Sequence, residues 1–225
     1  MILAIATATA SKAAWYEELK LSADLRYRFE YIDEEGKSSR ERDRIRARLG
    51  LTAPVNEEVT LGLRLTTAEE VNGEGDPISG NKTLSNMGTK KGFFLDLAYF
   101  AWAPSAVPGL NVVAGKMNNP FICVGDYLWD HDYTPEGIAV RYSVGDEWKI
   151  LANGAYHWIQ ERSADDDSMM LGGQLALVAP MGGRASLTVG GSLYGFTEME
   201  GRPLLDWTQE NRAYGNHTRT LVRGT

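Results

Sequence analysis

The clearest pattern in the sequence is a strict alternation of apolar and polar residues near the start of the chain. From Leu19 to Tyr31, apolar residues occupy every second position and charged or hydroxyl residues fill the positions between them. This period of two predicts a β-strand, because the apolar face of a helix would recur every three or four residues. Ordinary strands have about five or six residues, whereas a tilted strand that crosses a bilayer needs about nine to eleven. The length therefore favours a membrane-spanning strand.

The alternation continues along the chain and predicts about nine strands. After the first one, we expect strands at 44–51, 59–66, 93–102, 110–117, 137–143, 148–158, 169–179 and 184–196. Long polar connections at 67–92 and 118–135, which carry no hydrophobic period, contrast with short turns at 144–147 and 180–183. Outer-membrane barrels have long loops on the outer side and short turns on the periplasmic side. The predicted fold is all-β, an antiparallel transmembrane β-barrel.

Composition excludes several other classes of protein. No stretch approaches the roughly 18 to 20 apolar residues of a membrane helix, so a helical membrane protein is excluded. The content of 24 Gly, 10 Tyr and 6 Trp suits many strands closed by tight turns. The net charge of −7 argues against a nucleic-acid partner, since such domains usually carry a basic face. With Cys123 as the single cysteine, an intramolecular disulfide and a cysteine-based zinc site are excluded.

The two ends of the chain lead to separate expectations. Residues 1–14 form an apolar run followed by small residues, typical of the end of a secretory signal peptide, although an ordinary apolar N-terminal strand is the alternative. Residues 15–225 would then form the barrel domain. Nine strands that start on the periplasmic side end on the outer side, whereas bacterial single-chain barrels have an even number of strands. We therefore expect the barrel domain to be C-terminally incomplete.

The polar face of the first three strands carries a column of basic residues that we call the basic ladder. If the apolar face points to lipid, the ladder lines the lumen, and its expected pore-lining residues are Lys20, Arg26, Arg28, Arg44, Arg46, Arg48 and Arg64. Asp24 and Glu30 are the carboxylates that share this face locally, so the wall should have a positive potential. Arginines in a pore favour anions. The alternative is that carboxylates from other strands or loops neutralise the arginines.

Aromatic and acidic residues supply the other candidate features. Aromatic residues near strand ends predict the interfacial girdles of a barrel, with stacking on sugars as the alternative: Tyr27, Phe29, Tyr31, Tyr127, Trp129, Trp148, Tyr156 and Trp158. Asp130, Asp132 and Glu136 form an acidic cluster that lacks the glycine turn of a calcium loop, so solvated loop charge or a lumen constriction is favoured over a metal. No His–carboxylate–Ser pattern stands out. We expect no catalytic residue, metal or cofactor.

Five segments in a fixed order resemble the putative porin family of Gram-negative outer-membrane β-barrels. They are the opening strand at 24–28, the hairpin return at 42–49, the segment 115–121, Trp129–Asp132 with Thr134–Gly137, and the late segment 211–216. The resemblance covers nearly all of the chain after residue 14. It implies a signal peptide, an outer-membrane barrel and passive diffusion of small polar solutes, and it supplies no catalytic residue.

The sequence therefore predicts a porin in the cell outer membrane of a Gram-negative bacterium, and not an enzyme. Its expected partners are outer-membrane lipid and small polar solutes or ions, with a homo-oligomer, a trimer by analogy, as a further expectation. Two alternatives stay open. One is a non-conducting outer-membrane barrel that acts as a surface adhesin or scaffold, and the other is a secreted all-β binding protein or enzyme.

Overall fold

The computed structural model describes residues 18–71, 73–85 and 87–200, and among these it contains strands but no α-helix. The strands are β1 (Lys20–Ile32), β2 (Arg40–Pro54), β3 (Val59–Thr66), β4 (Glu70–Val71), β5 (Glu74–Gly75), β6 (Lys82–Thr83), β7 (Phe94–Trp102), β8 (Leu110–Lys116), β9 (Glu136–Val144), β10 (Lys149–Gln160), β11 (Ser168–Pro180) and β12 (Ser186–Thr197). The expectations at 1–14 and 211–216 lie outside the described residues.

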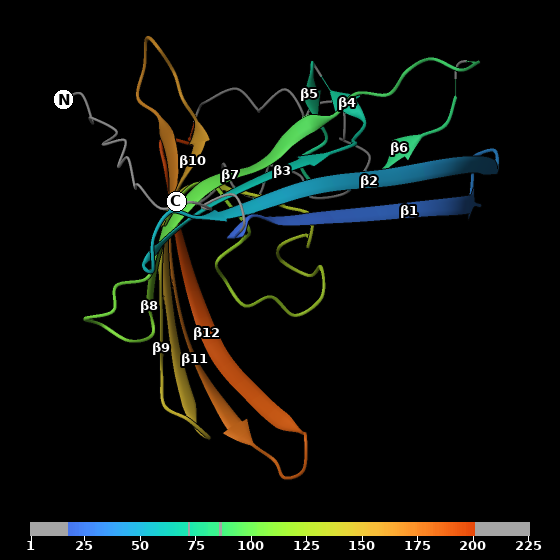
Figure 1. The fold of residues 1–225 in the computed structure, drawn as a ribbon. Helices are drawn as coiled ribbons and strands as arrows, with labels where there is room; N and C mark the ends of the chain where they lie inside the picture. The colour runs from blue at the N-terminus through green and yellow to red at the C-terminus, as the bar shows by residue number, and fades with distance from the viewer. Residues whose placement is uncertain (1–17, 72, 86, 201–225) are drawn as a thin grey trace.

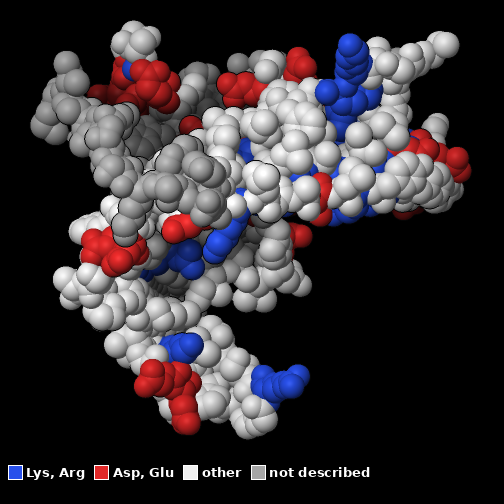
Figure 2. Space-filling model, viewed as in Figure 1, with Lys and Arg blue, Asp and Glu red and all other residues white. Residues whose placement is uncertain are grey.

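Nine long strands form one antiparallel sheet in the order β1-β2-β3-β7-β8-β9-β10-β11-β12. Each of them pairs with the next long strand in the sequence, so the prediction of about nine consecutive antiparallel strands is confirmed. The sheet bends strongly, so that its β1–β3 and β9–β12 ends form two diverging arms (Figure 1), and the space-filling view shows a hollow between them (Figure 2). Within the described residues, β1 and β12 are the sheet edges and do not pair with each other. Closure into a barrel therefore stays a prediction.

The connection 67–92 is not the structureless loop that its sequence suggested. It contains the small β4–β5 hairpin, and its strand β6 joins the main sheet by pairing with β2. In this pairing Thr83 lies opposite Arg44, and Lys82 lies opposite Ile45. Because β3 ends at Thr66, opposite Arg48, the first half of β2 has no partner in β3. The loop supplies that partner through β6. A strand of two residues is too short to show a period in the sequence.

The sheet has an apolar face and a polar face, because residues that pair across strands point to the same side. Leucines, valines and aromatic residues project from the apolar face into open space, and Leu25 and Leu193 are 78% and 81% exposed. The polar face carries arginines on β1–β3 and mainly small or uncharged residues on β9–β12, with Arg141 and Lys149 as charged exceptions. This face lines the hollow between the arms, where charged side chains are visible in Figure 2.

Aromatic residues mark both ends of the apolar face. Tyr31 and Trp158 lie at the end with the long loops, whereas Trp102 and Trp148 lie at the end with the short turns. About ten residues separate Trp148 from Trp158, or roughly 34 Å along an antiparallel strand. A tilt of about 45° reduces this length to about 24 Å, close to the ~25 Å apolar band of outer-membrane barrels.

The connections at the two ends of the sheet differ less in length than the sequence suggested. One end carries the turns 55–58, 103–109, 145–148 and 181–185, and the other carries 33–39, 67–93, 117–135 and 161–167. Only two connections of the second group are long. In the β9–β10 turn, Gly145 has a φ of 99°, and a Cβ there would lie 2.0 Å from the carbonyl oxygen of Trp148. Glycine is therefore required at this turn.

Candidate functional site

The predicted basic ladder lies on the polar face, as the register between strands shows. Arg26 pairs with Arg46 and Arg28 pairs with Arg44, so β1 and β2 present their arginines on the same side. Lys20 lies at the short-turn end of β1 on this face. The sequence prediction missed Arg42, which the structure includes because β2 begins at Arg40 rather than at residue 44. Extending the alternation two residues earlier would have found it.

Carboxylates from the same hairpin engage part of the ladder. The Glu30 carboxylate forms ion pairs with Arg28 and Arg42, and the Nη1 atom of Arg44 lies 3.7 Å from it. The Nε of Arg46 donates a 3.0 Å hydrogen bond to an Asp24 carboxylate oxygen. The two carboxylates that the sequence analysis placed on this face thus act as local partners of the arginines.

The loop 67–92 adds further polar partners to the ladder. The side-chain oxygen of Asn81 accepts a hydrogen bond of 2.6 Å from Arg26, and its carbonyl oxygen accepts one of 3.0 Å from Arg44. Glu69 forms an ion pair with Lys82 at 3.0 Å and lies 3.8 Å from Arg44. Burial opposes ionisation of the Glu69 carboxyl, but hydrogen bonds from Thr83 and Lys82 outweigh it and lower its pKa. The loop therefore presents a charged acid to the basic wall.

The loop 118–135 approaches the ladder from the other side of the hollow. Its Asp132 forms an ion pair with Arg48 and lies 3.6 Å from the Nη1 atom of Arg46. Arg64 of β3 pairs at 2.5 Å with Asp96 of β7, whose other carboxylate oxygen accepts a hydrogen bond from Thr134. Most of the predicted ladder is thus engaged by carboxylates from loops and other strands, as in the alternative interpretation of the sequence.

An apolar anchor holds the first part of the same loop against the opposite arm. Phe121 is 5% exposed and packs edge-on against Tyr194 of β12, with ring centroids 5.1 Å apart. It occupies the space above Gly172 of β11, where a Cβ would lie 2.5 Å from the phenylalanine ring. The backbone of Ile122 donates a 2.7 Å hydrogen bond to Gln174. The loop thus crosses the hollow between the two arms, where Figure 1 shows it.

The aromatic girdle prediction fits the side chains on the strands but not all of the loop residues. Tyr27, Phe29 and Tyr156 project from the apolar face and are well exposed. Trp129 instead lies in the hollow, stacked on Tyr133 and edge-on to Tyr194. Burial raises the pKa of Tyr133 to about 12, with a smaller contribution from Glu136. Trp129 therefore helps to pack the loop 118–135 and does not belong to an interfacial girdle.

The predicted acidic cluster is not one site, because its members point in different directions. Asp132 faces the arginines, Asp130 caps the backbone N–H of Asp132 at 2.7 Å, and Glu136 pairs with Lys116 at 2.9 Å. Within the described ranges, no group of three or more His, Cys, Asp and Glu side chains could hold a metal ion. Only Asp132 fits the expectation of a lumen constriction.

The histidines and the cysteine, whose side chains often act in catalysis, do not lie together. His131 contacts Asp126 in the exposed loop, and the hydrogen bond between them raises the pKa of His131. His157 is fully buried in β10, edge-on to Phe121. Cys123 is free, and burial raises the pKa of its thiol. His217 lies outside the described residues.

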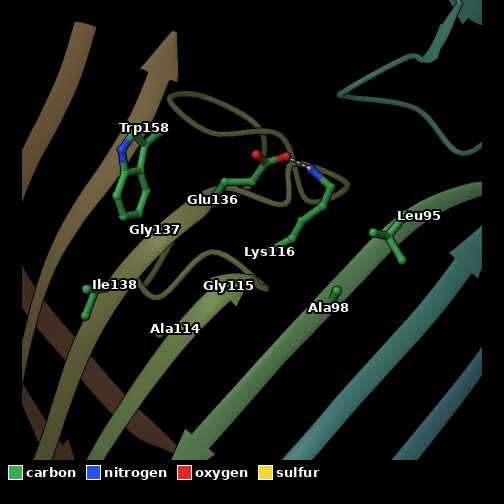
Figure 3. A pocket seen from close by; sticks show the side chains of 9 residues that line it. All are labelled: Leu95, Ala98, Ala114, Gly115, Lys116, Glu136, Gly137, Ile138 and Trp158. Carbon is green, nitrogen blue, oxygen red and sulfur yellow. Dashed lines mark hydrogen bonds and ion pairs between the residues drawn. The ribbon is translucent and has the colours of Figure 1, made fainter. Parts of the chain in front are cut away.

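A groove of about 510 Å³ lies on the apolar face where β7 to β10 run side by side (Figure 3). Its walls include Leu95 and Trp158, and the Lys116–Glu136 ion pair closes one end. Gly115 and Gly137 are directly paired in its floor. A Cβ on either glycine would lie within 2.2 Å of a carbonyl oxygen on the next strand, so the close packing of the strands requires both glycines.

Comparison with known proteins assigns the family. No helix among the described residues is long and apolar enough to cross a membrane. No curated protein matches the chain.

A family model described as putative porin matches residues 32–220, which include the ladder residues Arg44, Arg46, Arg48 and Arg64 and both long loops. The chain therefore belongs to the putative porin family.

Proposed function

We propose that this chain forms the wall of an outer-membrane porin, with its polar face along an aqueous passage and its apolar face in lipid. The observation that carries the proposal is the continuous exposed apolar face of the sheet, with Leu25, Leu171 and Leu193 more than half exposed. So large an apolar patch marks an interaction surface in a folded protein. The aromatic bands at both ends of this face support lipid as the partner.

In this proposal, the two long loops narrow the passage. Solutes would pass between the arginines of β1–β3 and the acidic loop residues, among them Glu69 and Asp132. The family assignment supports a porin-like activity, and we propose passive diffusion of small polar solutes or ions. Because loop carboxylates engage several arginines, we expect the ladder to favour anions only moderately.

The compartment and the oligomeric state are proposals that go beyond the family assignment. The outer membrane of a Gram-negative bacterium is the compartment in which a porin works. A homo-oligomer, such as the trimer common among porins, is a proposal by analogy. No step of the proposed mechanism requires a catalytic residue or a cofactor, because diffusion through a hydrated passage breaks no covalent bond.

Planar-bilayer recording of the full-length protein tests the proposal. We expect stepwise conductance increases in potassium chloride, and a reversal potential that indicates moderate anion preference under a salt gradient. An absence of conductance in correctly inserted protein would contradict the channel. Release of the protein from membranes by high salt alone would contradict the lipid-embedded apolar face, since salt screens charges but does not weaken apolar burial.

A non-conducting barrel that acts as an adhesin or scaffold is the second candidate. The packing of the loop 118–135 across the hollow favours it, because such a loop can close a passage as well as narrow it. Membrane insertion without conductance would support this candidate over the porin. The secreted binding protein receives less support, because its apolar residues should be buried inside the fold and these are exposed.

A further inference from the structure

Four arginines on the polar face form two like-charged pairs that lie next to each other in the sheet. Arg26 is directly opposite Arg46, and Arg28 is directly opposite Arg44. We call these four residues the arginine quartet. The pairs on either side of them combine opposite charges, Asp24 with Arg48 and Glu30 with Arg42. Like charges directly opposite each other destabilise a strand pair, so the quartet needs anionic partners.

The carboxylates around the quartet are shared with other cations. Glu30 also pairs with Arg42, and Asp132 also pairs with Arg48. Glu69, at 3.8 Å from Arg44, lies closer to Lys82, at 3.0 Å.

Two members of the quartet differ clearly in their partners. Arg46 donates a hydrogen bond to the Asp24 carboxylate, whereas Arg26 donates one to the neutral side chain of Asn81. The protein's own anions therefore leave part of the quartet uncompensated.

The quartet is partly covered by the loop 67–92. The segment Gly80–Asn81 lies over the quartet. It packs closely there, because a Cβ added to Gly80 would lie 3.1 Å from the Arg46 side chain. Arg44 is only 7% exposed, whereas the Arg28 side chain is 40% exposed. The Nε atoms of Arg26, Arg28 and Arg44 are enclosed and have no hydrogen-bond partner in the described part of the chain. Several enclosed guanidinium donors thus lie close to Arg28, whose side chain reaches solvent.

We propose that the arginine quartet binds a compact divalent oxyanion of the phosphate or sulfate type. Such an ion carries two charges and several acceptor oxygens, which suits the fixed fork of donors on arginine. It would lie beside the two like-charged pairs and compensate charge that the protein's own carboxylates leave unbalanced. The inference deepens the proposed function and rests on it, because it names a class of solute that the passage would retain.

Isothermal titration calorimetry on the folded full-length protein in detergent tests this site. Inorganic phosphate and sulfate are the probes, and acetate and chloride at matched ionic strength are the comparison ions. We expect both divalent ions to bind saturably and about tenfold or more tighter than acetate. Arg26→Gln, which removes an arginine without a hydrogen-bonded carboxylate, should weaken phosphate binding about tenfold or more.

Arg141→Gln is the matched control, because Arg141 lies on the same face in β9 and outside the quartet. It should bind phosphate as the parent protein does. Equal losses in both variants, equal binding of acetate and phosphate, or no saturable binding would each overturn the site. Phosphate binding by a protein without conductance would contradict the channel but support the site, whereas conductance without phosphate binding would do the reverse.

Discussion

The two arms of the sheet have the same outer face but very different inner faces. In the β1–β3 arm, the polar face carries long charged side chains that form ion pairs with residues of neighbouring strands and with Asp132 of the loop 118–135. In the β9–β12 arm, most of the corresponding positions carry small or uncharged residues, including Ala139, Ala155, Gly172, Gln174 and Ser192. The same alternation of apolar and polar residues is therefore compatible with a charged inner face and with an inner face of small residues.

The difference determines how the loop 118–135 crosses the hollow. The small residues of one arm leave room for Phe121, which packs there as in a protein core. The charged residues of the other arm fill their own space and hold Asp132 by charge. One end of the loop is thus held by shape and the other by electrostatics, and the two attachments can be broken separately.

Removal of the apolar anchor should have the largest effect. Phe121→Ala should lower the free energy of unfolding by about 3 kcal/mol, because it deletes a buried aromatic side chain. Urea unfolding in lipid vesicles measures this change. Tyr127→Ala is the control in the same loop, since Tyr127 is 95% exposed, and it should change stability by less than about 0.5 kcal/mol. Equal effects of the two variants would contradict the anchor.

Filling the space beneath the anchor should have a somewhat smaller effect. Gly172→Leu should destabilise the folded protein by about 2 kcal/mol, since overpacking a filled site typically costs about 1 to 3 kcal/mol. It should also expose the loop 118–135 to limited proteolysis. Gly173→Leu, next to it on the apolar face with nothing within 4 Å of its Cβ position, should leave both measurements unchanged. A protected loop in the Gly172 variant would argue against docking on β11.

Breaking the charged attachment should cost less stability but alter permeation. Asp132→Asn should lower the unfolding free energy by about 1 kcal/mol, because its partners Arg46 and Arg48 are partly screened by solvent. It should also shift the reversal potential further toward anions, since two arginines lose a carboxylate partner. Asp126→Asn removes the same charge from the exposed part of the loop. If both variants shift the potential equally, Asp132 has no special place in the passage.

The smallest expected effect is a local pH dependence at the exposed part of the loop. The hydrogen bond with Asp126 raises the pKa of His131, and the same bond lowers the pKa of Asp126. The charged contact should therefore weaken as pH rises through the raised His131 value, and again as pH falls through the lowered Asp126 value. NMR titration of His131 measures this, and Asp126→Asn should return its pKa toward the ordinary value. An unchanged titration would contradict the contact.

The strands and their faces could be predicted from the sequence because alternation is a local signal. The expected strand 59–66 is β3 as the structure has it, and the other long strands agree within a few residues except for the earlier start of β2. The alternation of Leu and Arg also placed the ladder on one face correctly.

The partners of the ladder could not be predicted, because they come from distant positions in the chain. Asp132 is 84 residues from Arg48, and Asp96 is 32 residues from Arg64. No periodicity specifies which way a loop without strands will turn. The inward position of Trp129 has the same cause, since its environment is built from Tyr194 on another strand.

The order of strands has a consequence for how the chain acquires its structure. Each long strand pairs with the next one along the chain, so most of the sheet can form as successive hairpins with little loop-closure entropy. Two pairings close long connections, β8 with β9 and β3 with β7, and the connection before β7 is the longer one and includes β4, β5 and β6. We expect the junction of β3 with β7 to form late, and a folding intermediate to contain two separately formed groups of hairpins on either side of it.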